Sequence, residues 1–179
     1  MDKFLYLAMN GASQSMLAQT TNANNLANAS TIGFKATLNN FQPTPVYGNG
    51  QADRVYSTDK GAGADFSQGP LMSTGRNLDV TINGEGWFVV QSTDGSETYS
   101  RRGDFHLDSN GILQNGSNQI VLGDGGPITI PEFESLVIGR DGTISIRGAG
   151  QSASTLIAID RIKLVNPDAN QLYRGEDGY

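Results

Sequence analysis

The sequence contains no cysteine in its 179 residues, which excludes disulfides, thiolate metal sites and cysteine nucleophiles. No apolar run approaches the roughly 18 residues of a membrane-spanning helix, so we expect no membrane insertion. Only 12 lysines and arginines stand against 18 acids, and the net charge of −6 argues against nucleic acid as a partner. The first residues lack a basic segment followed by an apolar one, and we therefore expect no cleaved signal peptide.

Glycine is scarce at the start of the chain and abundant after it. Residues 1–47 hold only Gly11 and Gly33 of the 23 glycines. The first 50 residues carry a net charge of +1, which leaves −7 for the rest because the whole chain carries −6. We interpret this change as a domain boundary. The prediction is a helix with a turn at 1–35, an extended connector at 36–75 and an antiparallel β domain at 76–179.

Apolar side chains within residues 3–28 recur at alternating spacings of four and three, which predicts a helix with a single stripe of heptad type. We call this stripe the seam; it consists of Leu5, Met9, Ala12, Met16, Gln19, Ala23 and Leu26. The opposite face is Ser, Gln, Thr and Asn with almost no charge. A seam of this kind packs against another helix. The alternative, an amphipathic helix lying on its own domain, fits the pattern equally well.

Residues 37–75 show no strong periodicity. Pro43 and Pro45 prevent a helix there, and six glycines interrupt a largely polar run. Because this is long for an ordinary loop, we expect the connector to pack along another surface or another subunit.

From Leu78 onward the sequence reads as short strands separated by turns. The turn dipeptides are Asn83-Gly84, Asp94-Gly95, Asn110-Gly111, Asn115-Gly116, Asp124-Gly125 and Asp141-Gly142. Such pairs accept the positive φ that tight hairpins require. The β-rich runs are 78–82, 87–91, 98–101, 120–122, 128–130, 136–138, 143–147 and 156–165. They predict a mainly β domain, an antiparallel barrel or sandwich of short strands.

No convincing active site emerges from the sequence. His106 is the only histidine and lies on a probable strand, where Asp104 and Asp108 share its face merely by alternation. Glu132 and Glu134 could suggest paired catalytic carboxylates, as could Asp79, Glu85 and Asp104. Most of these acids lie in turns, where Asp is favoured for local reasons. The sequence therefore predicts no catalytic residue, no metal site, no cofactor and no small-molecule substrate.

Trp87 and Phe88 are the one aromatic pair that suggests a binding platform. Because adjacent strand residues point to opposite faces, at least one of them must face inward, and core packing is the default interpretation. An exposed Trp87 would instead favour a carbohydrate- or peptidoglycan-binding β module or a weak hydrolase, which a glycan titration would detect.

Four segments in the right order resemble the family of flagellar rod and hook proteins. They are NNLANASTIGFKA at 24–36, TGRNLDVTINGEGWFVV at 74–90, YSRRGDFHLDSNGILQNGSNQIVLGDGGPITIP at 99–131 and NPDANQLYRGEDGY at 166–179. Together they span most of the chain. Within the family, the opening MDKFLYLAMNGASQSM and the segment NASTIGFKATLNNFQ are more similar to the proximal rod branch than to the distal rod branch.

The resemblance implies that N- and C-terminal helices line the centre of a tubular polymer, with the β domain outside. It further implies an assembly interface of Leu5, Met9, Ala12, Met16, Ala23, Asn24, Asn25, Leu26, Asn28, Gly33 and Phe34. Asn24, Asn25 and Asn28 would bond between packed helices, and Gly33 would permit the turn into the connector. Local capping of the helix by asparagine is the alternative.

The resemblance also implies a structural protein and not an enzyme. Its expected partners are other copies of itself, neighbouring rod proteins and the flagellar type III export apparatus. The expected location is the basal-body rod in the periplasmic space, reached without a cleaved signal peptide. The family continues into a C-terminal helix that pairs with the first one, so we expect this chain to be a fragment. Another rod or hook subunit remains the alternative within the family.

Overall fold

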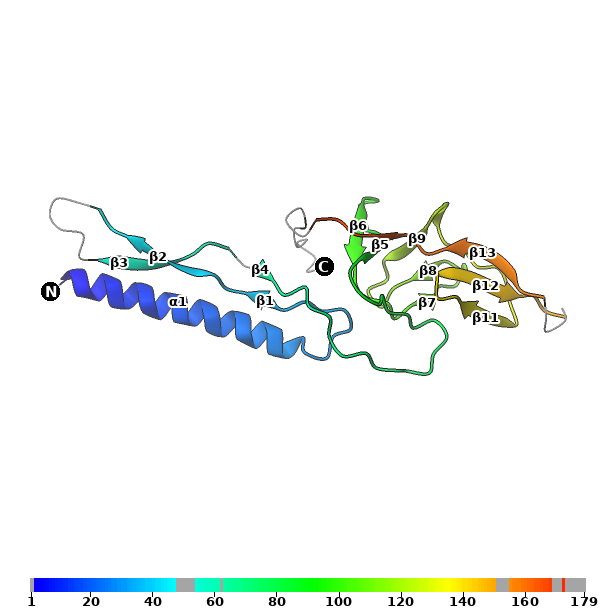
Figure 1. Ribbon diagram of the computed structural model, residues 1–179, viewed down its shortest axis with the longest axis horizontal. Helices are drawn as coiled ribbons and strands as arrows, with labels where there is room; N and C mark the ends of the chain where they lie inside the picture. The colour runs from blue at the N-terminus through cyan, green and yellow to red at the C-terminus, as the bar shows by residue number, and fades with distance from the viewer. Residues whose placement is uncertain (1, 48–53, 62, 151–154, 169–171, 173–179) are drawn as a thin grey trace. The chain divides into compact units, whose positions relative to one another are not determined.

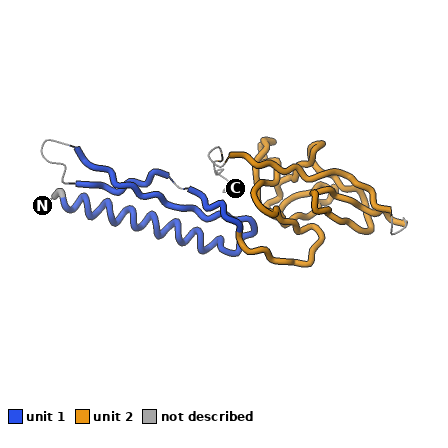
Figure 2. Tube along the Cα trace, viewed as in Figure 1, with its two compact units in different colours: residues 1–68 blue, residues 69–179 orange. Residues whose placement is uncertain are grey.

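The computed structural model describes residues 2–47, 54–61, 63–150, 155–168 and 172 (Figure 1). Two compact units make up the chain: unit 1 spans residues 1–68 and unit 2 spans residues 69–179 (Figure 2). Most of the segment NPDANQLYRGEDGY, namely 169–171 and 173–179, lies outside the described residues. Within them, no helix has the length and apolarity needed to span a membrane.

Unit 1 is one long helix beside two pairs of short strands. The helix α1 (Asp2–Ala27) matches the predicted helix to within one residue at each end. The strand pairs are β1 (Thr37–Leu38) with β4 (Gly63–Ala64) and β2 (Phe41–Pro45) with β3 (Val55–Asp59), both antiparallel. Both β3 and β1 contact α1. Much of the expected connector is therefore extended, but it forms strands alongside the helix of its own unit.

Pro43 and Pro45 fit inside β2 because of the register of the hairpin. Ladder bonds run from Val46 N to Arg54 O and from Lys60 N to Asn40 O, both 3.0 Å. In an antiparallel pair such rungs alternate along the strand, so residues 41, 43 and 45 turn their backbone groups away from β3. A proline at these positions loses no ladder bond.

Unit 2 contains two antiparallel sheets. The first has seven strands in the order β14-β5-β9-β8-β7, with β6 added to β5 and β10 added to β9. The second has the order β11-β12-β13. Their bounds are β5 (Trp87–Gln91), β6 (Glu97–Ser100), β7 (His106–Leu107), β8 (Leu113–Gln114), β9 (Ile120–Gly123), β10 (Gly126–Pro127), β11 (Ser135–Ile138), β12 (Thr143–Arg147), β13 (Ile157–Arg161) and β14 (Leu164–Val165). The fold is mainly β, as predicted, and no sheet in the described part of the chain closes into a barrel.

The core of unit 2 draws on both sheets. The cluster consists of Phe88, Val90, Phe105, Leu113, Val121, Ile128, Ile130, Leu136, Ile144, Ile146 and Ile162. Phe88 on β5 meets Phe105 edge to face, with ring centroids 5.2 Å apart. On β12 the buried Ile144 and Ile146 alternate with more exposed neighbours, as in a strand with one face toward the core. Unit 2 therefore has a hydrophobic core of its own, to which both sheets contribute.

The structure differs from the predicted strands at three runs. The run 156–165 forms two strands in different sheets, β13 and β14. Residues 78–82 and 128–130 are not strands, and each takes part only in an isolated bridge, Asp79 with Asp104 and Thr129 with Ile112. Ile128 and Ile130 are nonetheless buried. The apolar run at 128–130 therefore indicated burial correctly, but burial alone does not show that a segment is a strand.

Candidate assembly interface

The seam of α1 is exposed to solvent. Leu5 is 65% exposed, Met16 69% and Leu26 78%, and Met9, Ala12, Gln19 and Ala23 are exposed as well. Soluble proteins rarely leave a contiguous apolar stripe uncovered unless something binds to it. The seam is therefore the strongest candidate for an interaction surface in unit 1.

The face of α1 that docks on the strands is the polar one. Half-buried residues recur along it at Leu7, Asn10, Gln14, Ala18, Thr21, Asn25 and Asn28. At about 100° per residue, the centre of this face lies roughly 180° around the helix from the centre of the seam. Within unit 1, the alternative that the seam itself docks on the chain's own strands does not hold.

Two asparagines attach this polar face to the strands in the same way. Asn10 Nδ2 donates to Ser57 O at 3.2 Å, and Ser57 N donates to Asn10 Oδ1 at 3.0 Å. Asn25 Nδ2 donates to Thr37 O at 2.9 Å, and Thr37 N donates to Asn25 Oδ1 at 3.0 Å. Each amide thus satisfies both backbone groups of one edge residue. Asn25 thus makes two hydrogen bonds inside unit 1, to the backbone of Thr37.

The helix ends through local bonds. Asn28 Nδ2 donates to Asn24 O at 3.0 Å, and Thr31 Oγ1 donates to Asn28 Oδ1 at 3.3 Å. Asn28 therefore caps the helix terminus, the alternative that the sequence left open. Gly33 then adopts φ 75° in a turn closed by Phe34 N to Thr31 O at 3.2 Å. This is the turn expected of Gly33, and it leads the half-buried Phe34 toward β1.

The candidate chemical residues of unit 2 have structural surroundings. His106 is half-buried on β7 opposite Gln114. Asp104 accepts two bonds from Arg102, at 2.8 and 3.0 Å. Glu134 pairs with Arg147 at 3.4 Å. Among the described residues, no cluster of His, Asp and Glu is suited to a metal ion.

Other acids of unit 2 also bond locally. Asp79 accepts a 2.6 Å bond from the Thr74 hydroxyl and lies 3.5 Å from Arg76 Nε. Glu85 and Glu132 are exposed. These carboxylates therefore do not converge on a shared substrate position.

The two adjacent aromatics of β5 differ in burial. Phe88 is 3% exposed and belongs to the core. Trp87 is half-buried, and the guanidinium carbon of Arg101 lies 5.5 Å from its ring centroid. Burial is the first cause that lowers the pKa of Arg101, and the charge of Glu85 opposes it. Because a cation already covers part of the indole, Trp87 makes a poor platform for stacking a sugar ring.

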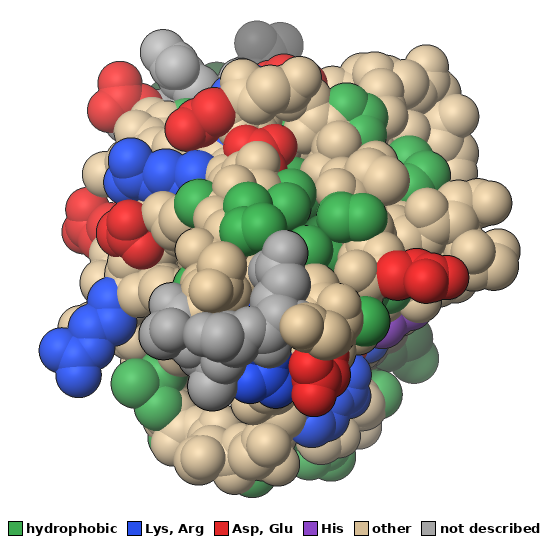
Figure 3. Space-filling view, turned by 90° about the vertical axis from the view of Figure 1, so that its right-hand side faces the viewer, with side chains coloured by type: hydrophobic (Ala, Val, Ile, Leu, Met, Phe, Trp, Pro, Cys, Tyr) green, Lys and Arg blue, Asp and Glu red, His purple; other side chains and the backbone are tan. Residues whose placement is uncertain are grey.

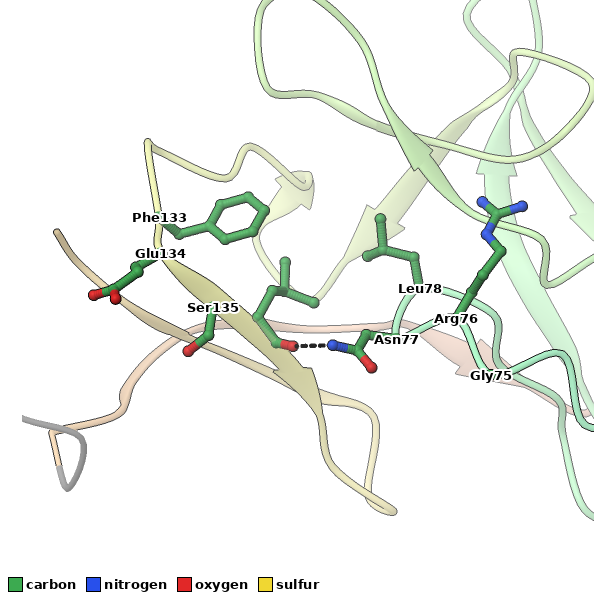
Figure 4. Close-up of a pocket in the computed structure, with 8 residues that line it drawn as sticks. Gly75, Arg76, Asn77, Leu78, Phe133, Glu134 and Ser135 are labelled. Carbon is green, nitrogen blue, oxygen red and sulfur yellow. Dashed lines mark hydrogen bonds between the residues drawn. The ribbon is translucent and has the colours of Figure 1, made fainter.

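A hollow of about 430 Å³ in unit 2 lies between residues 75–78 and 133–136. Asn77 Nδ2 donates to Leu136 O at 3.4 Å across it. Figure 4 shows the Phe133 ring and the Leu78 side chain projecting into this space, whereas Glu134 points away.

The face of the molecule drawn in Figure 3 carries apolar, acidic and basic side chains side by side, and neither charge sign dominates it. Nothing here resembles a preorganised catalytic pocket.

Comparison with known proteins gives consistent matches. A family model described as the flagellar hook protein FlgE/F/G D1 domain matches residues 81–146. The flagellar basal-body rod protein FlgF of Salmonella typhimurium strain LT2 is 43% identical over 99% of this chain and 70% of its own length. FlgF of Escherichia coli strain K12 is 42% identical over the same shares of both chains. FlgG of Bacillus subtilis strain 168 is 34% identical over 79% of this chain and 60% of its own length.

The chain belongs to the FlgF family of flagellar basal-body rod proteins. It is a structural rod subunit, and FlgF relatives fit it better than FlgG relatives do. The family model falls entirely within unit 2, whereas the FlgF matches also include the helix and its strands.

The rod-protein motifs of unit 2 hold its leading segment on the sheets. Val80 N donates to Gly103 O at 2.9 Å, and Phe105 N donates to Leu78 O at 3.4 Å. A Cβ at position 103 would collide with the backbone oxygen of Val80, so only glycine allows this approach. Packing of residues 78–80 against residues 103–105 therefore accounts for the glycine at position 103.

Proposed function

We propose that this rod-family chain assembles through the seam of α1, which packs against helices of neighbouring copies and of other rod proteins. The observation that carries the proposal is that the helix docks on its own strands by its polar face and leaves the seam open. A seam with heptad spacing is the surface by which helices pack side by side. The subunit would then transmit torque through helix–helix and β–β contacts, without catalysing a reaction.

We further propose the rest of the assembly route. The subunit passes through the flagellar type III export apparatus without a cleaved signal peptide and joins the proximal rod in the periplasmic space. A neighbouring helix over the seam would also remove the apolar exposure that the isolated unit shows.

Single charge substitutions on the seam test the proposal in cells. We expect Leu26→Asp or Met16→Asp, introduced into the gene for this chain, to leave the protein produced but rods incomplete and cells non-motile. An unpaired carboxylate in a packed apolar layer costs several kcal/mol per subunit, and the cost recurs at each contact. The measurement is swimming together with electron microscopy of isolated basal bodies.

Ser13→Asp is the matched control, because Ser13 is exposed on α1 outside the seam. It should support rods and swimming. Normal rods in both seam variants would remove the seam from the assembly interface.

A further inference from the structure

We propose that Asn10 and Asn25 are positioning residues that fix the rotation of α1 about its own axis, and thereby the direction in which the seam faces. This inference rests on the proposed role of the seam in assembly. It adds a reason why the apolar side of the helix stays available instead of folding back on the strands.

The two amides bind backbone groups on the outer edges of β3 and β1. The rungs at Asn40–Lys60 and Val46–Arg54 place the N–H and C=O of Ser57 on the outer edge of β3. In the second pair, Asp65 N donates to Ala36 O at 2.9 Å, so the backbone groups of Thr37 likewise point away from β4. Each asparagine fills the position of a neighbouring strand by offering one donor and one acceptor.

Two such attachments control rotation better than one. Asn10 and Asn25 lie 15 positions apart, roughly 22 Å along the axis and about 60° around it. One pair of bonds alone would let the helix pivot, whereas two pairs at this separation fix both its rotation and its axial register. Between them, the Thr21 hydroxyl donates a side chain–side chain bond to Asn39 Oδ1 at 3.1 Å.

Hydrophobic burial alone would favour the opposite rotation. The docked face between the two asparagines carries Gln14, Ala18 and Thr21. The seam over the same length carries Ala12, Met16, Gln19 and Ala23, and Met16 is the largest apolar side chain of the two sets. Turning the seam inward would bury more apolar area, but it would leave the edge groups of Ser57 and Thr37 without these partners. The two amides thus supply a polar preference that opposes the apolar one.

Introduced thiols can report this rotation because the chain has no cysteine. In the full chain, Ala12→Cys places a thiol on the exposed side and Ala18→Cys places one on the half-buried docked side. In dilute solution we expect iodoacetamide to alkylate the thiol at position 12 about fivefold faster than the one at position 18, since the docked side must open first. Adding Asn10→Ala and Asn25→Ala should bring the two rates within about twofold, with the helical circular dichroism retained.

The matched control replaces Asn22 and Asn24, two exposed asparagines of the same helix, by alanine and should keep the rate ratio. Asn10→Ala alone and Asn25→Ala alone should each give an intermediate rate ratio. An unchanged ratio in the variant that carries both substitutions would overturn the proposal. Loss of the helical circular dichroism in that variant would also overturn it, because the amides would then be needed for the helix itself. The thiol assay does not depend on assembly. If the seam variants formed normal rods, the assembly role of the seam would be rejected, but the thiol rates would still test whether the two asparagines fix the rotation of α1.

Discussion

At the scale of single residues, the adjacent aromatics Trp87 and Phe88 of β5 have different surroundings. Phe88 lies in the core against Phe105, while Trp87 faces the other side of the sheet under Arg101. The sequence predicted that at least one of them faces inward but gave no means of choosing Phe88, because alternation sets the period and not the phase.

We expect Phe88→Ala to destabilise unit 2 by about 3–5 kcal/mol, since it removes a fully packed ring and leaves a cavity. Trp87→Ala should cost less, because its half-buried ring returns less apolar area to water. Urea unfolding followed by circular dichroism measures both. A larger loss from Trp87→Ala would show that the Trp87 side of the sheet is the better packed one.

The role of Asn25 could not be read from the sequence. The run Asn24-Asn25-Leu26-Ala27-Asn28 marks a special position, and family resemblance indicated assembly, but neither says which backbone each amide meets. The partner of Asn25 is the backbone of Thr37, 12 positions along the chain, and the free edge of β1 appears only in three dimensions. By contrast, the turn at Gly33 was predictable because the positive φ is a local requirement.

At the scale of elements, the reliable sequence signals were local ones. The seam period predicted α1, and the β-rich runs 87–91 and 143–147 predicted β5 and β12 with the bounds that the structure shows. The two-residue strands β7, β8 and β10 left no periodic signal because they are too short to show one. The prolines of β2 excluded a helix but did not indicate a strand, because a strand tolerates proline only where its backbone groups point away from the partner strand.

Acidic turns of unit 2 should make its stability depend on pH. Bonds from the Thr143 hydroxyl and N–H hold the pKa of Asp141 below its ordinary value of 3.8. Bonds from Ser96 lower the pKa of Asp94, and backbone bonds led by Ile112 lower that of Asp108. A depressed folded-state pKa stabilises the fold above 3.8, and this contribution is lost as the pH falls through the folded value.

We therefore expect the urea midpoint of unfolding to fall as the pH is lowered from about 5 to about 2. Replacing Asp94, Asp108 and Asp141 together by Asn should lower the midpoint at neutral pH and flatten its decline in acid. Equal pH slopes for the variant and the unchanged chain would mean that these carboxylates contribute no differential stability.

At the scale of the whole molecule, the two units differ in where their apolar residues lie. Unit 2 has a core drawn from two sheets and carries most of the acidic charge, which favours solubility on the outside of an assembly. Unit 1 contributes none of the buried hydrophobic core residues found among the described positions, and it presents an apolar seam instead. In the proposed assembly, the seam of unit 1 would become buried against neighbouring subunits.

The most direct measurement is the accessibility of a seam position before and after assembly. Leu26→Cys introduces the only thiol of the chain at a position that is 78% exposed in the isolated protein. We expect a small maleimide to label it readily in the isolated chain and at least about tenfold more slowly in purified basal bodies, where a packed helix would cover it. Equal labelling in both states would contradict burial of the seam in the rod.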